Sequence, residues 1–419
     1  DDAVGPDQLA ANAVVTGSIA NGTIIEADMA DNAVTLAKMA SLARGKIIVG
    51  DSAGDPSALA IGSNGTVLKS DGTDVSWGTV ASSLNDLTNA TVNSGDPAVD
   101  TNPAGGVGSL WINSTSGEVY VCITATTDAN DWINVGEGTG NILAPYTMSY
   151  LVVAGGGAGC GQYSSVMGGG GAGGMLTGTH STAAGIQFTA TIGSGGTGTY
   201  SFHSVGAAGS NSSLAGSGLT TVTSTGGGGG GGQSTGTLNG GSGGGEGSVN
   251  GAGSGTSGQG NDGGNKSSSG VIIGGGGGGK GAAGGNGGNN TGGTGGVGGT
   301  SSITGSSTYY AGGGGGGGET NTGGYVKGAG GNGGGGTAGD NANNSNGNGI
   351  AGTANTGGGG GAASKAAGGG NSGGSGGSGI VILRVPTFNY SGTTSGSPTV
   401  TTDGSFTVIK FTGTGTYTS

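Results

Sequence analysis

Residues 292–300 read GGTGGVGGT, and residues 373–378 read GGSGGS. In both stretches two glycines alternate with one larger residue, so the pattern repeats every three residues. Three residues per turn is the period of a polyproline II type helix, which rises ~3.1 Å per residue and makes no internal hydrogen bonds. With two of every three side chains absent, such helices can pack together and bond their amides to carbonyls of neighbouring helices. The pattern therefore predicts a bundle of packed polyglycine II helices.

Glycine dominates one region of the chain. It accounts for 117 of 419 residues, and 94 of these lie between residues 151 and 379. None of the seven prolines falls in that region, which excludes collagen, since collagen needs ~15–20% proline or hydroxyproline. Proline would also remove a backbone donor from a lattice of helices, so its absence agrees with packing. The alternative is a flexible, disordered linker, because glycine has the most conformational entropy to lose.

Two apolar segments flank the glycine-rich region and favour order over disorder. Residues 150–154 read YLVVA and residues 379–385 read GIVILRV, and both are typical of buried strands. Between them, glycine runs of similar length are interrupted by short apolar groups such as Val271–Ile273 and Tyr309–Tyr310. Flexible linkers rarely have such matched ends, so we expect an ordered domain.

The first forty residues contain a repeat with an apolar residue at every fifth position. One column holds Val4, Val14, Ile24 and Val34, and the other holds Leu9, Ile19, Met29 and Met39. A five-residue step places side chains on one face of neither a helix nor a strand. We therefore expect a thin fibrous stalk, in which several copies of the chain, three in the simplest case, bury one apolar side chain per step. A disordered acidic leader is the alternative.

The remaining segments read as short β-strands separated by turns. Residues 45–80 show short apolar runs broken by Asn-Gly and Asp-Gly turn signals, and residues 109–135 show alternating runs broken by a turn at Ser114–Gly117. Both patterns predict antiparallel β structure. The predicted fold class is all-β and irregular. We expect five parts: a fibrous stalk at 1–44, a β fibre module and linker at 45–104, a small β module at 105–146, a glycine-rich polyglycine II domain at 147–385 and a C-terminal β segment at 386–419.

Two tryptophans in the small β module have two interpretations. Trp111 and Trp132 could form a platform for sugar rings, since aromatic faces suit pyranoses, or they could be the core of a tiny sheet with little else to bury. The core interpretation is favoured. Cys122 alternates with Val121 and Ile123 and is expected to be packed as well.

The charge balance and the scarcity of reactive side chains exclude several classes of function. The net charge is −12, with 17 acidic and 4 basic residues in the first 150, so no basic patch is present for nucleic acid or anionic membrane. No apolar run reaches the ~18 residues of a membrane span. The two histidines, His180 and His203, have no neighbouring Cys or carboxylate in the sequence. We expect no catalytic residues, no metal and no cofactor.

One segment imitates a nucleotide-binding motif. Gly274–Lys280 matches most of the P-loop pattern, but Gly281 occupies the Ser/Thr position and a helix cannot follow in glycine. Such matches are inevitable in this composition, so nucleotide binding is not expected.

The sequence resembles the glycine-rich distal domains of bacteriophage tail fibres and tail-fibre tip adhesins, in which polyglycine II helices form a lattice. The resemblance covers about residues 147–385 and rests on YLVVA at 150–154, GSNSS at 209–213 and SGIVILR at 378–384. Residues 43–80, 108–136 and 403–411 also look like phage fibre elements. Long polar insertions such as 340–356 depart from this pattern and leave the receptor open.

The resemblance implies a homotrimeric, extracellular virion protein that attaches to a host bacterium. Its partners would be other tail, fibre or baseplate proteins at the N-terminal end, and a surface glycan or outer-membrane protein of the host. Loops at the ends of a rigid bundle suit recognition, and aromatic and amide side chains suit contact with sugars or proteins. The candidate receptor-binding residues are Tyr163, Phe202, His203, Tyr309, Tyr310, Tyr325, Asn343 and Asn344.

Three other readings of the sequence stay open. The candidate tyrosines and Phe202 could instead cap the ends of the bundle. The chain could be a bacterial cell-surface adhesin or extracellular matrix filament without a phage role. A glycan-cleaving fibre would need paired carboxylates, and the glycine-rich region offers only Glu246, Asp262, Glu319 and Asp340.

Overall fold

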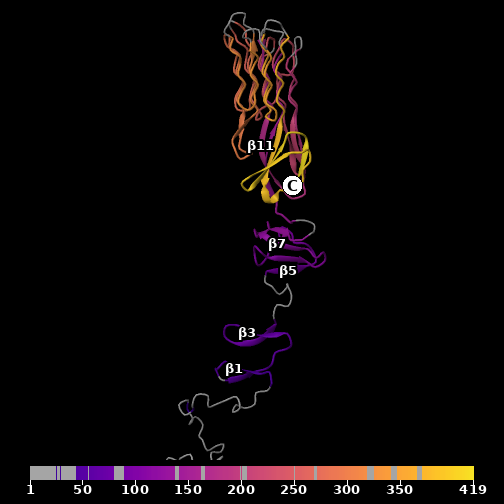
Figure 1. Cartoon of the computed structure of the whole chain (residues 1–419), viewed down its shortest axis with the longest axis vertical. Helices are drawn as coiled ribbons and strands as arrows, with labels where there is room; N and C mark the ends of the chain where they lie inside the picture. The colour runs from indigo at the N-terminus through magenta and orange to yellow at the C-terminus, as the bar shows by residue number, and fades with distance from the viewer. Residues whose placement is uncertain are drawn as a thin grey trace, which may run out of the picture. The chain divides into compact units, whose positions relative to one another are not determined.

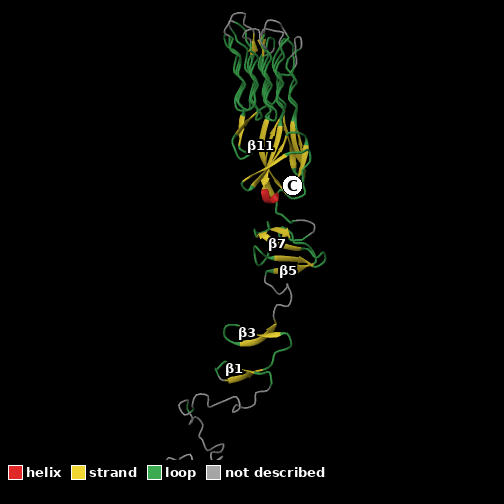
Figure 2. Cartoon of the chain, viewed as in Figure 1, coloured by secondary structure: helices red, strands yellow, loops and turns green. Residues whose placement is uncertain are grey.

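The computed structural model describes residues 25, 29, 44–54, 56–79, 89–136, 141–161, 166–198, 200, 205–249, 251–268, 271–318, 325–340, 347–365 and 370–419. Over these residues the chain consists of β-strands and extended segments, with one short 3-10 helix, η6, at Thr387–Asn389 (Figure 2). The all-β and irregular fold class is confirmed. The chain divides into two compact units, residues 1–90 and 91–419. Of the predicted stalk at 1–44, all but residues 25, 29 and 44 lie outside the described residues.

Two separate β-hairpins make up most of the described part of the first unit. β1 (Ile47–Gly50) pairs with β2 (Pro56–Leu59), and β3 (Thr66–Ser70) pairs with β4 (Val75–Thr79). Both pairs are antiparallel, as the turn signals predict. Each sheet has only two strands, and most of its side chains are exposed. Neither hairpin therefore has a core of its own.

A four-stranded sheet with a small core follows in the second unit. Its order is β5-β6-β7-β8, with bounds Ala90–Asn93, Leu110–Asn113, Val119–Thr124 and Asp131–Asn134. The core consists of Trp111, Tyr120, Cys122 and Trp132. The two indoles meet edge to face with their ring centroids 6.0 Å apart. Both tryptophans are thus buried core residues and not a platform for sugars.

The small β module begins earlier than the sequence predicts. The amide of Ser114 donates to the carbonyl of Asn93 at 2.7 Å, and the indole of Trp111 donates to the carbonyl of Gly95 at 2.8 Å. Residues 89–104, which the sequence assigns to the preceding module, therefore belong to this one. Sequence reasoning misses the strand β5 because it has only four residues, ATVN, and a single large apolar side chain, Val92.

Two sheets lie at one end of the glycine-rich domain (Figure 1). The five-stranded sheet has the order β11-β9-β18-β20-β19, with bounds Met175–Thr182, Tyr146–Val153, Ile380–Pro386, Phe406–Phe411 and Thr399–Asp403. The four-stranded sheet has the order β14-β13-β12-β21, with bounds Leu219–Ser224, Ser212–Gly216, Gln187–Thr191 and Gly415–Thr418. The strands that flank the glycine-rich region, β9 and β18, pair directly with each other.

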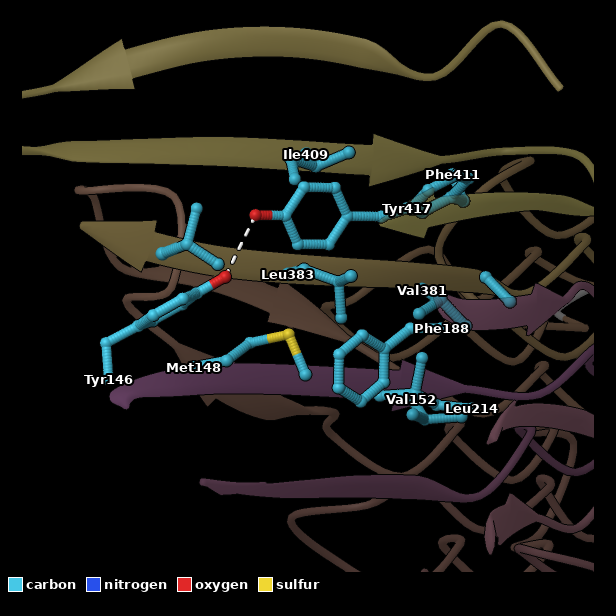
Figure 3. Close-up of a cluster of buried hydrophobic side chains, with 12 residues drawn as sticks. Tyr146, Met148, Val152, Phe188, Leu214, Val381, Leu383, Ile409, Phe411 and Tyr417 are labelled. Carbon is cyan, nitrogen blue, oxygen red and sulfur yellow. Dashed lines mark hydrogen bonds between the residues drawn. The ribbon is translucent and has the colours of Figure 1, made fainter. Parts of the chain in front are cut away.

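One hydrophobic core joins these two sheets (Figure 3). β9, β18 and β20 supply Met148, Val152, Leu383 and Phe411, among others, while β12, β13 and β21 supply Phe188, Leu214 and Tyr417. All seven side chains are at most 1% exposed. The sheets therefore form a conventional side-chain core on which the glycine-rich bundle is built.

The last forty residues are part of the glycine-rich domain and not a separate segment at 386–419. β20 pairs with β18 over Val381–Pro386, and β21 pairs with β12 over Gln187–Ala190. The alternation in residues 406–411 explains this, because Val408 faces one core of the five-stranded sheet and Ile409 faces the other. The sequence correctly predicts the strand but not that both its faces are buried by residues far away in the chain.

Between β9 and β18 the chain runs back and forth in extended, glycine-rich segments that lie side by side (Figure 2). Short ladders interrupt them, namely β10 (Val166–Met167) with β17 (Gly317–Gly318), and β15 (Gly299–Ser301) with β16 (Thr308–Tyr310). We call this set of segments the bundle.

Residues 168–173 show how the bundle is held together. Their amides donate in turn to carbonyls of three neighbouring segments. The amides of Gly168 and Gly171 donate to Gly231 and Gly228, and those of Gly169 and Ala172 donate to Gly275 and Gly278. The amides of Gly170 and Gly173 donate to Gly360 and Gly357. The bonds measure 2.8 to 3.0 Å. The direction of donation repeats every three residues, which is the period of a polyglycine II helix.

The carbonyls of the same segment accept from three further segments. Gly168 accepts from Cys160, Gly169 from Gly245, and Gly170 from Gly314. The segment thus has six hydrogen-bonded neighbours, three that accept from its amides and three that donate to its carbonyls. Residues 168–173 therefore lie inside a hexagonal lattice of polyglycine II helices, as the period of three predicts.

Backbone packing makes glycine obligatory inside the lattice. A Cβ atom on Gly157 would overlap the carbonyl oxygen of Gly228, and one on Gly170 would overlap that of Gly157, both far inside the 3.0 Å that real Cβ atoms keep. The larger residues in the bundle are confined to small clusters, such as Cys160, Met167, Ala362 and Ala363. The core of the bundle is accordingly made of backbone rather than side chains.

Candidate functional site

The candidate site is the end of the bundle away from the two sheets, which we call the far end (Figure 1). Its described residues are those next to the returns of the chain: Gly161, Val166, Tyr200, Val205, Val249, Gly251, Ser268, Val271, Gly318, Tyr325, Asp340, Gly347, Lys365 and Gly370. Segments distant in sequence meet there, since Ile273 bridges to Gly318 and Thr291 bridges to Val326. The lattice therefore brings described segments that are distant in sequence together at this end.

Several apolar side chains at the far end are exposed. Tyr200 is 44% exposed, Val249 60%, Ile272 45% and Val326 56%. The apolar triplet at residues 271–273 is split, because Ile273 is fully buried against the bundle while Val271 and Ile272 remain exposed. Exposed apolar groups rimmed by polar residues mark interaction surfaces. We call Tyr200, Val249, Val271, Ile272 and Val326 the apolar tip residues.

Two ion pairs link segments of the bundle close to these residues. The ammonium of Lys266 lies 2.9 Å from a carboxylate oxygen of Glu246 and donates to the carbonyl of Ser248. Lys327 and Asp340 form a second, more exposed pair at 3.3 Å. Each pair links two adjacent segments, so these charged groups fix the geometry of the far end.

The structure places only some of the predicted receptor-binding residues. Tyr163, Phe202, His203, Asn343 and Asn344 lie outside the described residues. Described residues next to them, including Gly161, Tyr200, Val205, Asp340 and Gly347, lie at the far end.

Tyr325 lies at the far end and is half-buried. Its hydroxyl accepts a hydrogen bond from the hydroxyl of Ser364 at 2.9 Å. Burial raises the pKa of the Tyr325 phenol to about 12. The side chain therefore joins two segments of the bundle, and its exposed neighbour in the sequence, Val326, is better placed for contact.

Tyr309 and Tyr310 lie at the opposite end of the bundle, in β16. Tyr310 is 6% exposed and packs with Ile303, Met175 and Ile382 in the second core of the five-stranded sheet. This burial corrects its assignment as a contact residue, because β16 turns alternate side chains to opposite faces. Tyr309 is 45% exposed and remains available for contact.

Sequence reasoning misses most of the apolar tip residues. Val249 is a single valine in polar surroundings, and nothing in its local sequence distinguishes it from Val297, which lies near the sheets. Val326 follows Tyr325, which is the more conspicuous candidate in the sequence. The available signal is position: each stands beside a return of the chain, where side chains point outward from the lattice. This signal can be used only when it is known which returns of the chain lie at which end of the bundle.

The other groups that suggested chemistry have structural roles. The amides of Gly274–Gly279 donate to carbonyls within the bundle, so they do not form a phosphate-binding loop. Burial raises the pKa of the Cys160 thiol to about 12, which disfavours the reactive thiolate. Asp262 accepts a hydrogen bond from the amide of Gly255. Glu319 lies outside the described residues.

The part of the chain that the structure describes contains neither a candidate metal site nor a candidate membrane-spanning helix. No group of three or more His, Cys, Asp or Glu side chains is placed to hold a metal ion there. Within the same residues, no helix is long and apolar enough to cross a membrane.

The bundle and the strands around it define a family. A family model described as a glycine-rich domain matches residues 134–386, which is more than half of the chain. The chain therefore belongs to this glycine-rich domain family. The match ends in β18, the strand that closes the bundle. No match to a curated protein or to a solved structure was found.

Proposed function

We propose that this chain is a bacteriophage tail-fibre protein that attaches the virion to its host through the far end of the glycine-rich bundle. The observation that carries the proposal is that separate segments of a rigid lattice each present an exposed apolar side chain at the far end. Ile272 and Val326 belong to different segments, yet both are exposed beside returns at that end. Rigid scaffolds that present loops are a common form of binding surface.

The lattice explains why such a surface can vary while the fold persists. Within the bundle, side chains are excluded by the close approach of backbones, as at Gly157 and Gly170. At Gly251, beside one of the returns, a Cβ atom would meet no atom within 4 Å, so the constraint does not hold there. A receptor-binding protein needs this separation between a fixed scaffold and a variable contact surface.

The remaining parts of the proposal concern assembly. The protein is a homotrimer located in the virion, where the N-terminal end contacts other tail, fibre or baseplate proteins. The far end contacts an outer-membrane protein or a glycan of the host bacterium. No reaction is assigned to it.

Binding of the fluorescently labelled full chain to a panel of bacterial strains tests the proposal. On the strains that bind it, Ile272→Asp and Val326→Asp should each weaken binding by about tenfold or more, since burying a carboxylate in an interface costs at least ~1.4 kcal/mol. Val297→Asp is the matched control, because Val297 is 41% exposed but lies away from the far end. Equal loss in all three variants, or binding to no strain, contradicts the proposal.

A further inference from the structure

A groove lies at the sheet end of the domain, on the opposite side from the far end. It has a volume of about 560 Å³ and runs between the five-stranded sheet and the loop that joins β15 to β16. The sheet contributes Ser149, Thr177, Thr179 and Arg384, while Ser301 at the end of β15 and Ser302 in the loop line the other side. This volume falls within the range of small-ligand pockets.

The strand register places the polar side chains of the floor in one row. Thr179 in β11 lies directly opposite Ser149 in β9, which lies directly opposite Arg384 in β18. Directly paired residues share a face of the sheet. Thr177 stands two residues from Thr179 and therefore on the same face. Thr177 and Thr179 are both exposed, so their hydroxyls are accessible in the groove.

The Arg384 side chain is held by three separate contacts. Its Nη1 atom lies 2.7 Å from a carboxylate oxygen of Asp403 and donates to the carbonyl of Ile303 at 3.2 Å. The guanidinium also lies 4.2 Å above the centroid of the Phe406 ring. Because Ile303 belongs to the loop, Arg384 ties the loop to the sheet.

A second contact fixes the same loop. Gly305 has a φ of +90° and approaches the Asp403 carboxylate so closely that a Cβ atom there would lie 2.6 to 2.7 Å from the carboxyl atoms. The loop thus contacts the ion pair at two points, through the carbonyl of Ile303 and through the close approach of Gly305 to Asp403. The two walls of the groove are therefore preformed, which lowers the entropic cost of binding.

We propose that this groove binds a neutral saccharide, as a second binding site on the same domain. Serine and threonine hydroxyls both donate and accept hydrogen bonds, which matches the hydroxyl groups of a sugar. The guanidinium is neutralised by Asp403, so the groove offers no net positive charge to a phosphate or a carboxylate. The floor at Thr177, Thr179 and Ser149 is polar, which suits a sugar better than an apolar peptide.

This site is independent of the proposed host contact at the far end. The two surfaces lie at opposite ends of the bundle and share no residues. A fibre with both sites holds the protein receptor at one end and a neighbouring surface sugar near the other. Either site can fail experimentally while the other stands.

Saturation-transfer difference NMR on the full chain tests the groove, with glucose, galactose, N-acetylglucosamine and rhamnose as probes at millimolar concentration. At least one sugar should receive saturation from the protein. The double variant Thr177→Val, Thr179→Val should lose most of that signal, because it removes two exposed hydroxyls while keeping β-branched side chains in β11. Thr191→Val, at another exposed strand threonine in β12, should retain it.

Three outcomes would overturn the proposal. The first is that none of the four sugars receives saturation from the wild-type chain. The second is that the double variant keeps the full signal, which would place the sugar elsewhere. The third is that inorganic phosphate displaces the bound sugar, which would assign the groove to anions.

Discussion

The phenol oxygens of Tyr146 and Tyr417 lie 3.0 Å apart inside the glycine-rich domain, although 271 residues separate them (Figure 3). Tyr146 begins β9, the strand that leads into the bundle, and Tyr417 lies in β21 at the end of the chain. Tyr417 is fully buried and Tyr146 is 9% exposed. One hydrogen bond thus joins the two sheets at the point where the domain begins and ends.

This pair makes the domain sensitive to alkali. Burial is the main cause that raises the pKa of both phenols above the ordinary value of ~10. In the unfolded chain the phenols lose their protons above pH ~10, whereas the folded state keeps them, so stability is full below pH ~10 and falls as the pH rises further. Urea unfolding followed by near-ultraviolet circular dichroism at pH ~7 and pH ~11 should show this loss.

The variant Tyr417→Phe separates the hydrogen bond from the titration. At pH ~7 it should lower the free energy of unfolding by about 1 kcal/mol, because the Tyr146 hydroxyl loses its partner. The further loss on going to pH ~11 should be smaller than in the wild type, since one buried phenol no longer titrates. Tyr309→Phe, at an exposed position, should change neither quantity, and an unaltered alkaline loss in Tyr417→Phe would contradict this explanation.

The lattice predicts opposite effects for alanine at two glycines. Gly170→Ala places a methyl group against the carbonyl of Gly157, and overpacking of this kind costs ~1–3 kcal/mol or more. Gly251 is exposed, and a Cβ atom built there meets no atom within 4 Å. Gly251→Ala should therefore be neutral or raise the stability by up to ~1 kcal/mol, because alanine restricts the unfolded chain.

Thermal or urea unfolding of the two variants, monitored in parallel, measures this difference. A loss at Gly170 with none at Gly251 is the expected result. Similar losses at both positions would mean that backbone conformation, rather than close packing, makes glycine necessary. No loss at either would contradict a lattice packed through backbone contacts.

The ion pair of Arg384 and Asp403 should contribute modestly to the stability of the domain, but it should strongly restrict the motion of the loop between β15 and β16. A double-mutant cycle with Arg384→Met and Asp403→Asn should give a coupling energy of ~0.2–1 kcal/mol, the range for partly exposed pairs. Hydrogen exchange at Ser302 and Ile303 should become faster in Arg384→Met, since Ile303 loses the hydrogen bond to the guanidinium. Unchanged exchange in the loop would show that Arg384 does not hold it.

Sequence reasoning finds the lattice because its requirements are local. The period of three, the absence of proline and the flanking strands at 150–154 and 379–385 each follow from short stretches of residues. The pairing of β9 with β18 agrees with the interpretation of these stretches as matched ends. A backbone lattice therefore leaves a clear signature in composition and period.

The neighbours within the lattice are not encoded in the same way. Gly168 donates to Gly231 and Gly169 donates to Gly275, but glycine segments carry no side chains that would distinguish one partner from another. Which return of the chain lies at which end is therefore hidden. For the same reason the tyrosines of the candidate site stand out in the sequence, whereas Val326 and Val249 emerge only from the structure.

The two hairpins at residues 44–79 predict self-association of the chain. Isolated two-stranded sheets are marginally stable in water at best, and here Ile48 is 44% exposed, Ile61 68% and Leu68 43%. Since each hairpin lacks a core, copies of the chain that pack around a common axis would cover these side chains. Sedimentation of the full chain at micromolar concentration should therefore give the mass of a trimer.

Charged substitutions locate the surface that holds the copies together. The double variant Ile48→Asp, Leu68→Asp should shift the sedimenting species toward the monomer, because association would bury two carboxylates without partners. Val107→Asp is the control, since Val107 is 66% exposed but lies outside the hairpins. A wild-type monomer would contradict the trimer, and a trimer that survives the double variant would place the contacts in another part of the chain. The glycine-rich domain should stay folded in every case, because its lattice and both its sheets are completed within one chain.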